Sequence, residues 1–250
     1  MLFIRLVGIC MLVALTSTQL LAITAEELEK AASKGKTVFM LVTEPNAGGI
    51  EQAREMVNAS SKQVKKSTVI QLDRADAANS ALVVKYRLTG APLPLIMVLA
   101  GNGAIAGGIP AANTTVEQLV KWVPTAKKAE VLKAVQDGQS VLITAASKGM
   151  LKETSVSSAC AAACGQMQGK CTSIKINLDD DDELPFLNEL KISPQSKEPV
   201  TVVINAQGQV TGSFAGGVEV GNLVQAATKK AGGCCPSGGA SSSSCGPTKK

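Results

Sequence analysis

The sequence contains no histidine among its 250 residues. This absence excludes Ser-His and Cys-His nucleophilic catalysis, histidine general bases and every metal site that needs an imidazole ligand. Aromatic residues are also scarce, at 2% of the chain, and the net charge is only +5. Because single-stranded nucleic acids bind along basic grooves that carry aromatic stacking platforms, this composition argues against a nucleic-acid partner.

The chain also lacks an apolar run long enough for an unambiguous membrane span. It opens with one basic residue, Arg5, followed by a short apolar stretch at 6–15, a polar neck at 16–19 and a small residue, Ala22. This order is typical of a cleavable export signal, whereas an anchoring helix would need a longer uninterrupted run. The sequence therefore predicts a signal peptide at 1–22, no membrane span after its removal, and a periplasmic or secreted protein.

Seven cysteines are present, and Cys10 falls within the predicted signal. Six remain in the exported chain, and an even number outside the cytoplasm is typical of disulfides, although the count does not give their connectivity. These six are Cys160, Cys164, Cys171, Cys234, Cys235 and Cys245.

What the sequence does contain is a long repeat. An apolar, β-branched run opens at Pro199 and closes with a turn at Gly208, and a similar run opens at Pro94 and closes at Gly103. Such runs, bounded by proline and glycine, indicate a buried strand that turns into a hairpin. Other matched positions, such as Val38 and Val141, have a similar separation of 103 to 105 residues. A period of this length indicates two whole domains.

Each half shows the order helix, strand, helix, strand, helix, hairpin, helix. We expect an α/β protein with two tandem domains, 26–123 and 127–230, each a mixed sheet flanked by helices. A low-complexity tail at 231–250 is expected to be flexible. The expected helices are 25–34, a helix starting at 50–58, 77–86, a helix capped by Thr114 or Thr115 through Trp122, 127–136, a helix within 150–164, 184–190 and 220–229; the expected strands are 37–43, 69–72, 140–145, 173–178 and the two hairpins.

This order resembles the thioredoxin superfamily, with a proline at the start of the third strand and an Asn-Gly or Gln-Gly turn after it. The stretch from Tyr86 to Pro92 is similar to the segment that leads to the family's cis-proline. The resemblance implies Pro92 or Pro94 as that proline in the first half and Pro199 in the second. It also implies that the surface around these prolines contacts an extended protein partner.

The family's reactive motif is missing. Thioredoxins act through Cys-x-x-Cys at the start of the first long helix after the central strand, where the helix N-terminus lowers the pKa of a thiol. The corresponding segments here, 44–49 and 147–150, contain no cysteine. Ordinary thioredoxin-type oxidoreductase activity is therefore not expected.

The remaining thiols leave several interpretations open. Cys160 and Cys164 have the i, i+4 spacing of one helical face, and Cys171 follows shortly before the next strand. Three thiolates are ligands that Cu(I) or Zn prefers. Alternatively, Cys164 and Cys171 form a disulfide and leave Cys160 free, or all three are buried as inert packing residues.

The tail offers Cys234, Cys235 and Cys245 as a tethered source of thiols for exchange or metal binding, or as a passive loop. The acidic run 179–183 lacks the glycine and distal glutamate of a calcium loop, and we expect a solvated helix cap.

Three functions follow as hypotheses. The first is a partner-binding module in the envelope or extracellular space, with thiol–disulfide exchange through these cysteines. The second is a copper or zinc carrier, and the third is a disulfide-closed scaffold.

Overall fold

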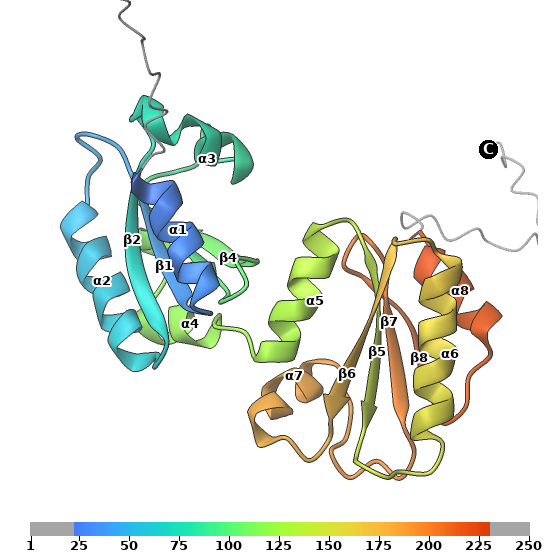
Figure 1. The fold of residues 1–250 in the computed structure, drawn as a ribbon. Coiled ribbons are helices and arrows are strands. Elements are labelled where there is room, and N and C mark those ends of the chain that lie inside the picture. Colours follow the sequence, from blue (N-terminus) through green and yellow to red (C-terminus); the bar gives the residue numbers. More distant parts are fainter. Residues whose placement is uncertain (1–22, 231–250) are drawn as a thin grey trace, which may run out of the picture.

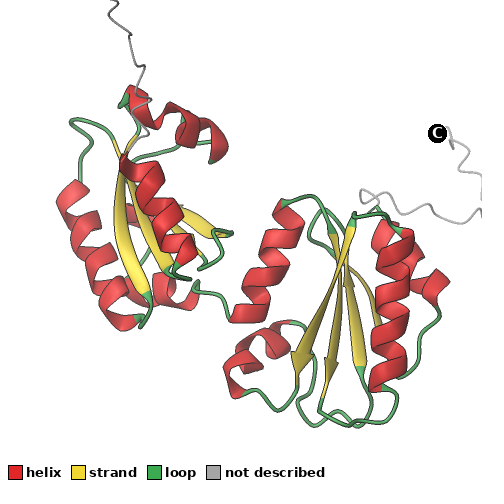
Figure 2. Cartoon of the chain, viewed as in Figure 1, coloured by secondary structure: helices red, strands yellow, loops and turns green. Residues whose placement is uncertain are grey.

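The structure, a computed structural model, describes residues 23–230 (Figure 1). The predicted signal at 1–22 and the tail at 231–250, with its three cysteines, lie outside the described residues. Two separate four-stranded sheets follow one another along the chain, and helices cover both faces of each sheet (Figure 2). We call the two halves the first repeat and the second repeat. The predicted α/β class, with tandem mixed sheets, is confirmed.

The first repeat contains one sheet of order β2-β1-β3-β4, in which β1 and β2 are parallel and the other neighbours antiparallel. Its elements are α1 (Ile23–Ser33), β1 (Thr37–Thr43), α2 (Ile50–Gln63), β2 (Ser67–Asp73), the 3-10 turn η1 (Ala77–Asn79), α3 (Ser80–Lys85), β3 (Leu95–Leu99), β4 (Ile105–Pro110), the 3-10 turn η2 (Ala111–Asn113) and α4 (Val116–Lys121).

The second repeat has the equivalent sheet, β6-β5-β7-β8, with the same strand directions. Figure 1 shows α5 and α7 on one side of this sheet and α6 and α8 on the other. Its elements are α5 (Ala126–Gln136), β5 (Ser140–Ala146), α6 (Glu153–Gln166), β6 (Cys171–Asn177), the 3-10 turn η3 (Asp181–Glu183), α7 (Leu184–Glu189), β7 (Val200–Ile204), β8 (Val210–Ala215) and α8 (Val220–Thr228).

The central strand of each sheet is buried along its whole length. All seven residues of β1 and all seven of β5 are buried. In β1, Val38 and Met40 pack in the cluster under α1 and α3, while Phe39 and Leu41 pack in the cluster under α2 and α4. Alternating side chains therefore form two cores, one on each face, which is why the strand reads as a continuous apolar run.

The register of the two sheets matches in detail. Val38 lies opposite Leu99 and Val141 lies opposite Ile204, and both hairpins carry a register shift at the same place, between Val98 and Leu99 and between Val203 and Ile204. Element boundaries differ from the sequence expectation mainly at ends. The helix expected from 50 extends to Gln63, and the strand expected from 173 begins at Cys171, because parallel pairing starts with Ser140 opposite Cys171.

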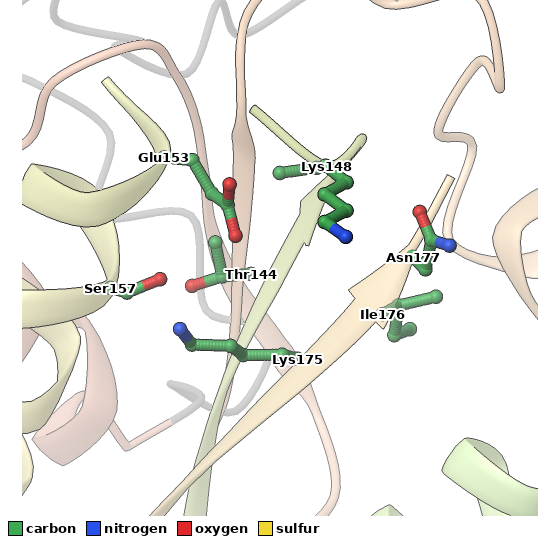
Figure 3. Close-up of a pocket in the computed structure, with 8 residues that line it drawn as sticks. Thr144, Lys148, Glu153, Ser157, Lys175, Ile176 and Asn177 are labelled. Atoms are coloured by element: carbon green, nitrogen blue, oxygen red, sulfur yellow. The ribbon is translucent and has the colours of Figure 1, made fainter. Parts of the chain in front are cut away.

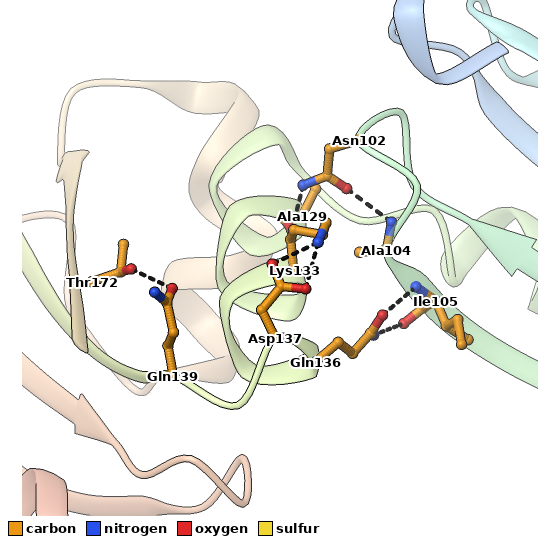
Figure 4. Close-up of polar contacts among 9 residues, drawn as sticks. All are labelled: Asn102, Ala104, Ile105, Ala129, Lys133, Gln136, Asp137, Gln139 and Thr172. Atoms are coloured by element: carbon orange, nitrogen blue, oxygen red, sulfur yellow. Dashed lines mark hydrogen bonds and ion pairs between the residues drawn. The ribbon is translucent and has the colours of Figure 1, made fainter. Parts of the chain in front are cut away.

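The repeats meet where α5 packs against the hairpin turn of the first repeat (Figure 4). The Asn102 side-chain amide donates to the Ala129 carbonyl at 2.8 Å. Gln136 makes two bonds to the backbone of Ile105, donating to its carbonyl at 2.7 Å and accepting from its N–H at 2.9 Å. A small apolar cluster that includes Ala104 and Leu132 supports these bonds. The Gln136 side chain of the second repeat thus satisfies both backbone groups of Ile105 at the start of β4.

Within residues 23–230, the longest helices have 14 residues, and none combines the length and apolarity that a membrane crossing requires.

Candidate functional site

The loop from β5 to α6 is the second repeat's counterpart of the thioredoxin reactive loop. Its backbone is left-handed at Gly149 and at Lys152, which precedes the first residue of α6. In the first repeat, Gly49 has the same conformation directly before α2. Both repeats therefore still present a helix N-terminus after the central strand. Neither loop carries a cysteine there.

Leu151 is the notable side chain of the second loop, because 80% of its surface is exposed. The next residue, Lys152, forms an ion pair with Glu198 at 2.9 Å, which joins the loop to the residue before Pro199. An isolated exposed leucine is unremarkable, but this one lies at the corner where the resemblance places the partner contact. The sequence pattern alone gave no reason to single out Leu151.

The prolines of the two repeats occupy equivalent places but differ in their peptide bonds. The Pro94 carbonyl accepts the Ala111 N–H at 2.8 Å, and the Pro199 carbonyl accepts the Gly216 N–H at the same distance. Leu93–Pro94 is cis, and among residues 23–230 it is the one cis bond. The suggestions of Pro92 and of Pro199 as cis-prolines are therefore wrong. The trans form is the lower-energy isomer of an X–Pro bond and is the default.

The cysteines lie at the far end of α6, away from this corner. Cys164 in the last turns of α6 and Cys171 at the start of β6 form a disulfide, with Cα atoms 4.9 Å apart. Cys160 is a free thiol with no exposed surface, and it shares a hydrogen bond of 3.3 Å with the Thr144 hydroxyl. The structure thus places the three thiols near one another, as their spacing in the sequence predicted. It pairs only two of them.

This disulfide leaves Cys160, Cys164 and Cys171 unable to form a three-thiolate site. In the described part of the chain, no group of three or more cysteine, aspartate or glutamate side chains is arranged to hold a metal ion. Copper or zinc binding by Cys160, Cys164 and Cys171 would first require reduction of the disulfide. The tail thiols Cys234 and Cys235, and Cys245 with them, lie outside the described residues.

The first repeat shows what these positions hold when cysteine is absent. α2 and α6 have equal length, so Ser61 corresponds to Cys164 and the buried Val57 to Cys160; likewise Ser67, the first residue of β2, corresponds to Cys171. The Ser61 and Ser67 hydroxyls form a hydrogen bond of 2.8 Å. The same helix-to-strand junction is therefore closed in both repeats, once by a hydrogen bond and once covalently.

Strand order, strand direction and the proline at the start of the third strand together decide the fold. Each repeat is thioredoxin-like. The resemblance predicted from the sequence is confirmed at this level.

No family model matches the chain, and no curated protein matches it. Solved structures do. The first two thioredoxin domains of Naumovozyma dairenensis Eps1p align at 11% identity, over 82% of this chain and 95% of that chain, with a TM-score of 0.33. The zinc-bound form of human ERp44 aligns at 10% identity, over 79% of this chain and 55% of that one, with a TM-score of 0.35.

Thioredoxin O1 from Arabidopsis thaliana, in its oxidised state, aligns at 21% identity over 38% of this chain and 86% of that chain, with a TM-score of 0.31. At these identities and TM-scores, the alignments do not indicate the function of this chain. The assignment of the thioredoxin-like fold rests on the topology described above.

The acidic run of the second thioredoxin-like repeat departs from expectation at one residue. Asp180 caps η3, accepting the Asp182 N–H at 3.1 Å, as expected for an acidic cap. Glu183, however, is only 2% exposed, and its Oε1 accepts the Lys127 N–H in the first turn of α5 at 2.8 Å. The prediction of a solvated cap is wrong for Glu183, because this buried carboxylate accepts one of the unpaired N–H groups at the start of another helix, that of Lys127.

Proposed function

We propose that this protein is exported and binds a protein partner at one corner of its second repeat. The corner consists of the loop 147–152 and Pro199. The observation that carries the proposal is the exposure of Leu151 at this corner. The thioredoxin-like fold supports it, since the resemblance stated above implies that an extended polypeptide docks beside this proline.

The chemistry of the corner favours binding over catalysis. The corner carries one apolar side chain, Leu151, and three charged ones, Lys148, Lys152 and Glu198. Its loop contains no nucleophilic thiol. An apolar anchor inside a polar rim is the usual composition of an interface centre. The ion pair between Lys152 and Glu198 connects the loop to the residue before Pro199 at this corner.

The proposal is tested with a fluorescently labelled, permanently unfolded polypeptide whose own cysteines are carboxymethylated. Leu151→Ser should weaken its binding about tenfold, the loss expected when one well-buried apolar anchor is removed. The matched control is Val210→Ser on β8, because Val210 is also an exposed aliphatic residue of the second repeat, at 60%. Equal affinities for the wild type and for Leu151→Ser would reject this corner as the contact site.

A second candidate function is thiol–disulfide exchange at Cys164–Cys171. The observation in its favour is that Cys164 is only half-buried, whereas Cys160 is closed off from solvent. A partner thiolate would attack the Cys164 sulfur, the Cys164–Cys171 bond would break, and Cys171 would leave as the thiolate. A second partner thiolate would then attack the partner's own sulfur in the mixed disulfide, which oxidises the partner and releases Cys164.

Exchange is distinguished from a closed scaffold by counting free thiols in the denatured protein, before and after treatment with a mild dithiol. Exchange predicts two additional thiols that map to Cys164 and Cys171 by peptide mass. Resistance to the dithiol supports the scaffold. Insulin reduction at the rate of ordinary thioredoxins would contradict both, since it requires the missing Cys-x-x-Cys. Copper or zinc carriage is tested by elemental analysis of the reduced protein purified without oxygen, and only trace metal per chain would remove it.

A further inference from the structure

A cavity of about 180 Å³ lies in the second repeat between α6 and the strands β5 and β6 (Figure 3). Neither Leu151 nor the two cysteines of the disulfide line it. A water molecule takes about 30 Å³ of liquid volume, so the space corresponds to about six waters. The polar side chains that line it come from both strands, from α6 and from the preceding loop: Thr144, Lys148, Glu153, Ser157, Lys175 and Asn177.

The charged side chains that line this cavity are not paired with one another, and Lys148 and Lys175 are exposed. Within residues 23–230, neither Lys148 nor Lys175 forms an ion pair or a side-chain hydrogen bond, and Glu153 accepts only the Gly149 N–H, at 3.2 Å. Figure 3 shows the Lys175 amine and the Ser157 hydroxyl pointing toward one another from opposite sides of the cavity. Three charged side chains therefore line one pocket, and no ion pair or hydrogen bond joins any two of them.

Ser157 supplies an independent observation. Its hydroxyl is buried, and it has no hydrogen-bond partner among the described residues. The neighbouring Thr144 hydroxyl is already bonded to the Cys160 thiol. A buried hydroxyl normally has a partner, because its desolvation is otherwise uncompensated. The Ser157 hydroxyl therefore leaves one hydrogen-bonding position open at the wall of this pocket.

The first repeat shows that this arrangement does not follow from the fold. Leu41 occupies the position of Thr144, and Gln71 lies opposite it, as Lys175 lies opposite Thr144. The Ser157 position holds Arg54, which donates to Gln71 at 3.1 Å and to Glu51 at 2.7 Å. In the first repeat, the larger Leu41 and Arg54 thus stand where the second repeat has Thr144 and Ser157, and Arg54 bonds to Gln71. In the second repeat, Lys175 has no such partner at the corresponding position.

We propose that this cavity binds a small carboxylate that also carries a hydrogen-bond donor, of the size of an α-amino or α-hydroxy acid. Two lysines against one glutamate favour an anion, and charge-assisted bonds from Lys148 and Lys175 hold its carboxylate. The Glu153 carboxylate accepts from the ligand's amine or hydroxyl, and the Ser157 hydroxyl gains its missing partner. The pocket shares Lys148 with the corner proposed above as the partner contact, while Glu153, Ser157, Lys175 and Asn177 lie outside that corner.

The experiment uses four probes of similar length and follows backbone amide chemical shifts together with calorimetry. L-Aspartate and L-malate carry carboxylates with an amine or a hydroxyl, succinate lacks the donor, and 1,4-diaminobutane has the opposite charge. We expect saturable shifts at Ser157, Lys175 and Asn177 with aspartate or malate, weaker binding of succinate and none of the diamine. Aspartate and malate distinguish amino acids from hydroxy acids.

Variants give the decisive comparison. Lys175→Met should weaken binding at least about tenfold, because a hydrogen bond to a charged group is removed. Lys170→Met, the same change at an exposed lysine just before β6, should leave the affinity unchanged. The variant Thr144→Leu/Ser157→Arg/Lys175→Gln copies the first repeat and should abolish binding; if it fails to fold, Lys175→Met alone decides.

Three results would overturn the proposal: no saturable shift with any carboxylate, equal binding of the diamine, or unchanged affinity in Lys175→Met. In the first case the cavity holds only water.

Discussion

The hydroxyls of Ser61 and Ser67 lie 2.8 Å apart at the two positions that Cys164 and Cys171 occupy in the second repeat. In both repeats, this contact ties the end of a 14-residue helix to the first residue of the edge strand that follows. A hydrogen bond is therefore sufficient to close the junction in this fold. The disulfide takes the place of this side-chain contact in the second repeat, which argues that the second repeat does not need a covalent link there in order to fold.

The first prediction follows from that comparison. Cys164→Ser/Cys171→Ser should keep the fold and lower the free energy of unfolding of the second repeat by about 2–3 kcal/mol, the chain-entropy estimate for so short a loop. Denaturant titration by circular dichroism measures the change. The wild type in strong reductant should behave like the variant, and complete unfolding of either would refute the comparison.

The reciprocal exchange is also testable. Ser61→Cys/Ser67→Cys should form a disulfide in the first repeat, because the junction has the same helix length and the same strand start. Intact mass after alkylation without reductant should show no more alkylated thiols than in the wild type. Ser61→Cys alone should add one alkylated thiol. Two added thiols in the double variant would show that the junctions are not equivalent.

Gly107 in β4 packs against the chain's single tryptophan. A Cβ atom at Gly107 would lie 2.6 Å from the Trp122 ring, whereas one at Gly108 would meet Met97 at an ordinary 3.5 Å. Gly107→Ala should therefore destabilise the first repeat by about 1–3 kcal/mol, as overpacking does, and shift the fluorescence of Trp122. Gly108→Ala is the matched control and should do neither. An unshifted emission maximum in Gly107→Ala would contradict the packing.

Glu183 offers a prediction about the start of the second repeat. Glu183→Ala removes the acceptor of the Lys127 N–H and should cost about 1–3 kcal/mol, because a buried donor is left unpaired. Glu183→Gln keeps an oxygen acceptor and should cost much less. Thermal unfolding of both variants measures the difference. Equal losses would mean that the charge of Glu183, and not its hydrogen bond, stabilises the first turn of α5.

The fold could be predicted from the sequence because the patterns that indicate its strands and helices are local and occur twice. The apolar run at 37–43 and the proline-led hairpins each predict a strand by themselves, and their recurrence after 103 to 105 residues identifies two domains. Thr115 was one of two proposed caps, and it forms a capping box with Gln118. The helix expected at 77–86 divides into η1 and α3 around Asn79, a detail that periodicity over ten residues does not resolve.

The site could be predicted less well from the sequence, because its properties depend on neighbours that are distant along the chain. Spacing brought Cys160, Cys164 and Cys171 together but could not select the pair, since the choice depends on where β6 begins. Glu183 belongs to a run of acidic residues that is typical of a solvated cap, and only the position of α5 buries it. The cavity beside Ser157 arises from small residues on separate elements, which no pattern in one segment reveals.

The two bonds from Gln136 to Ile105 also bear on self-association. A strand at the border of a sheet exposes backbone groups that invite pairing with another chain, and such borders are a common route to aggregation. Here the Gln136 amide makes two hydrogen bonds to Ile105, the first residue of β4, in the place of a neighbouring strand. The second repeat therefore occupies the backbone groups of Ile105 at this border, and separating the two halves would leave them free to pair with the strand of another chain.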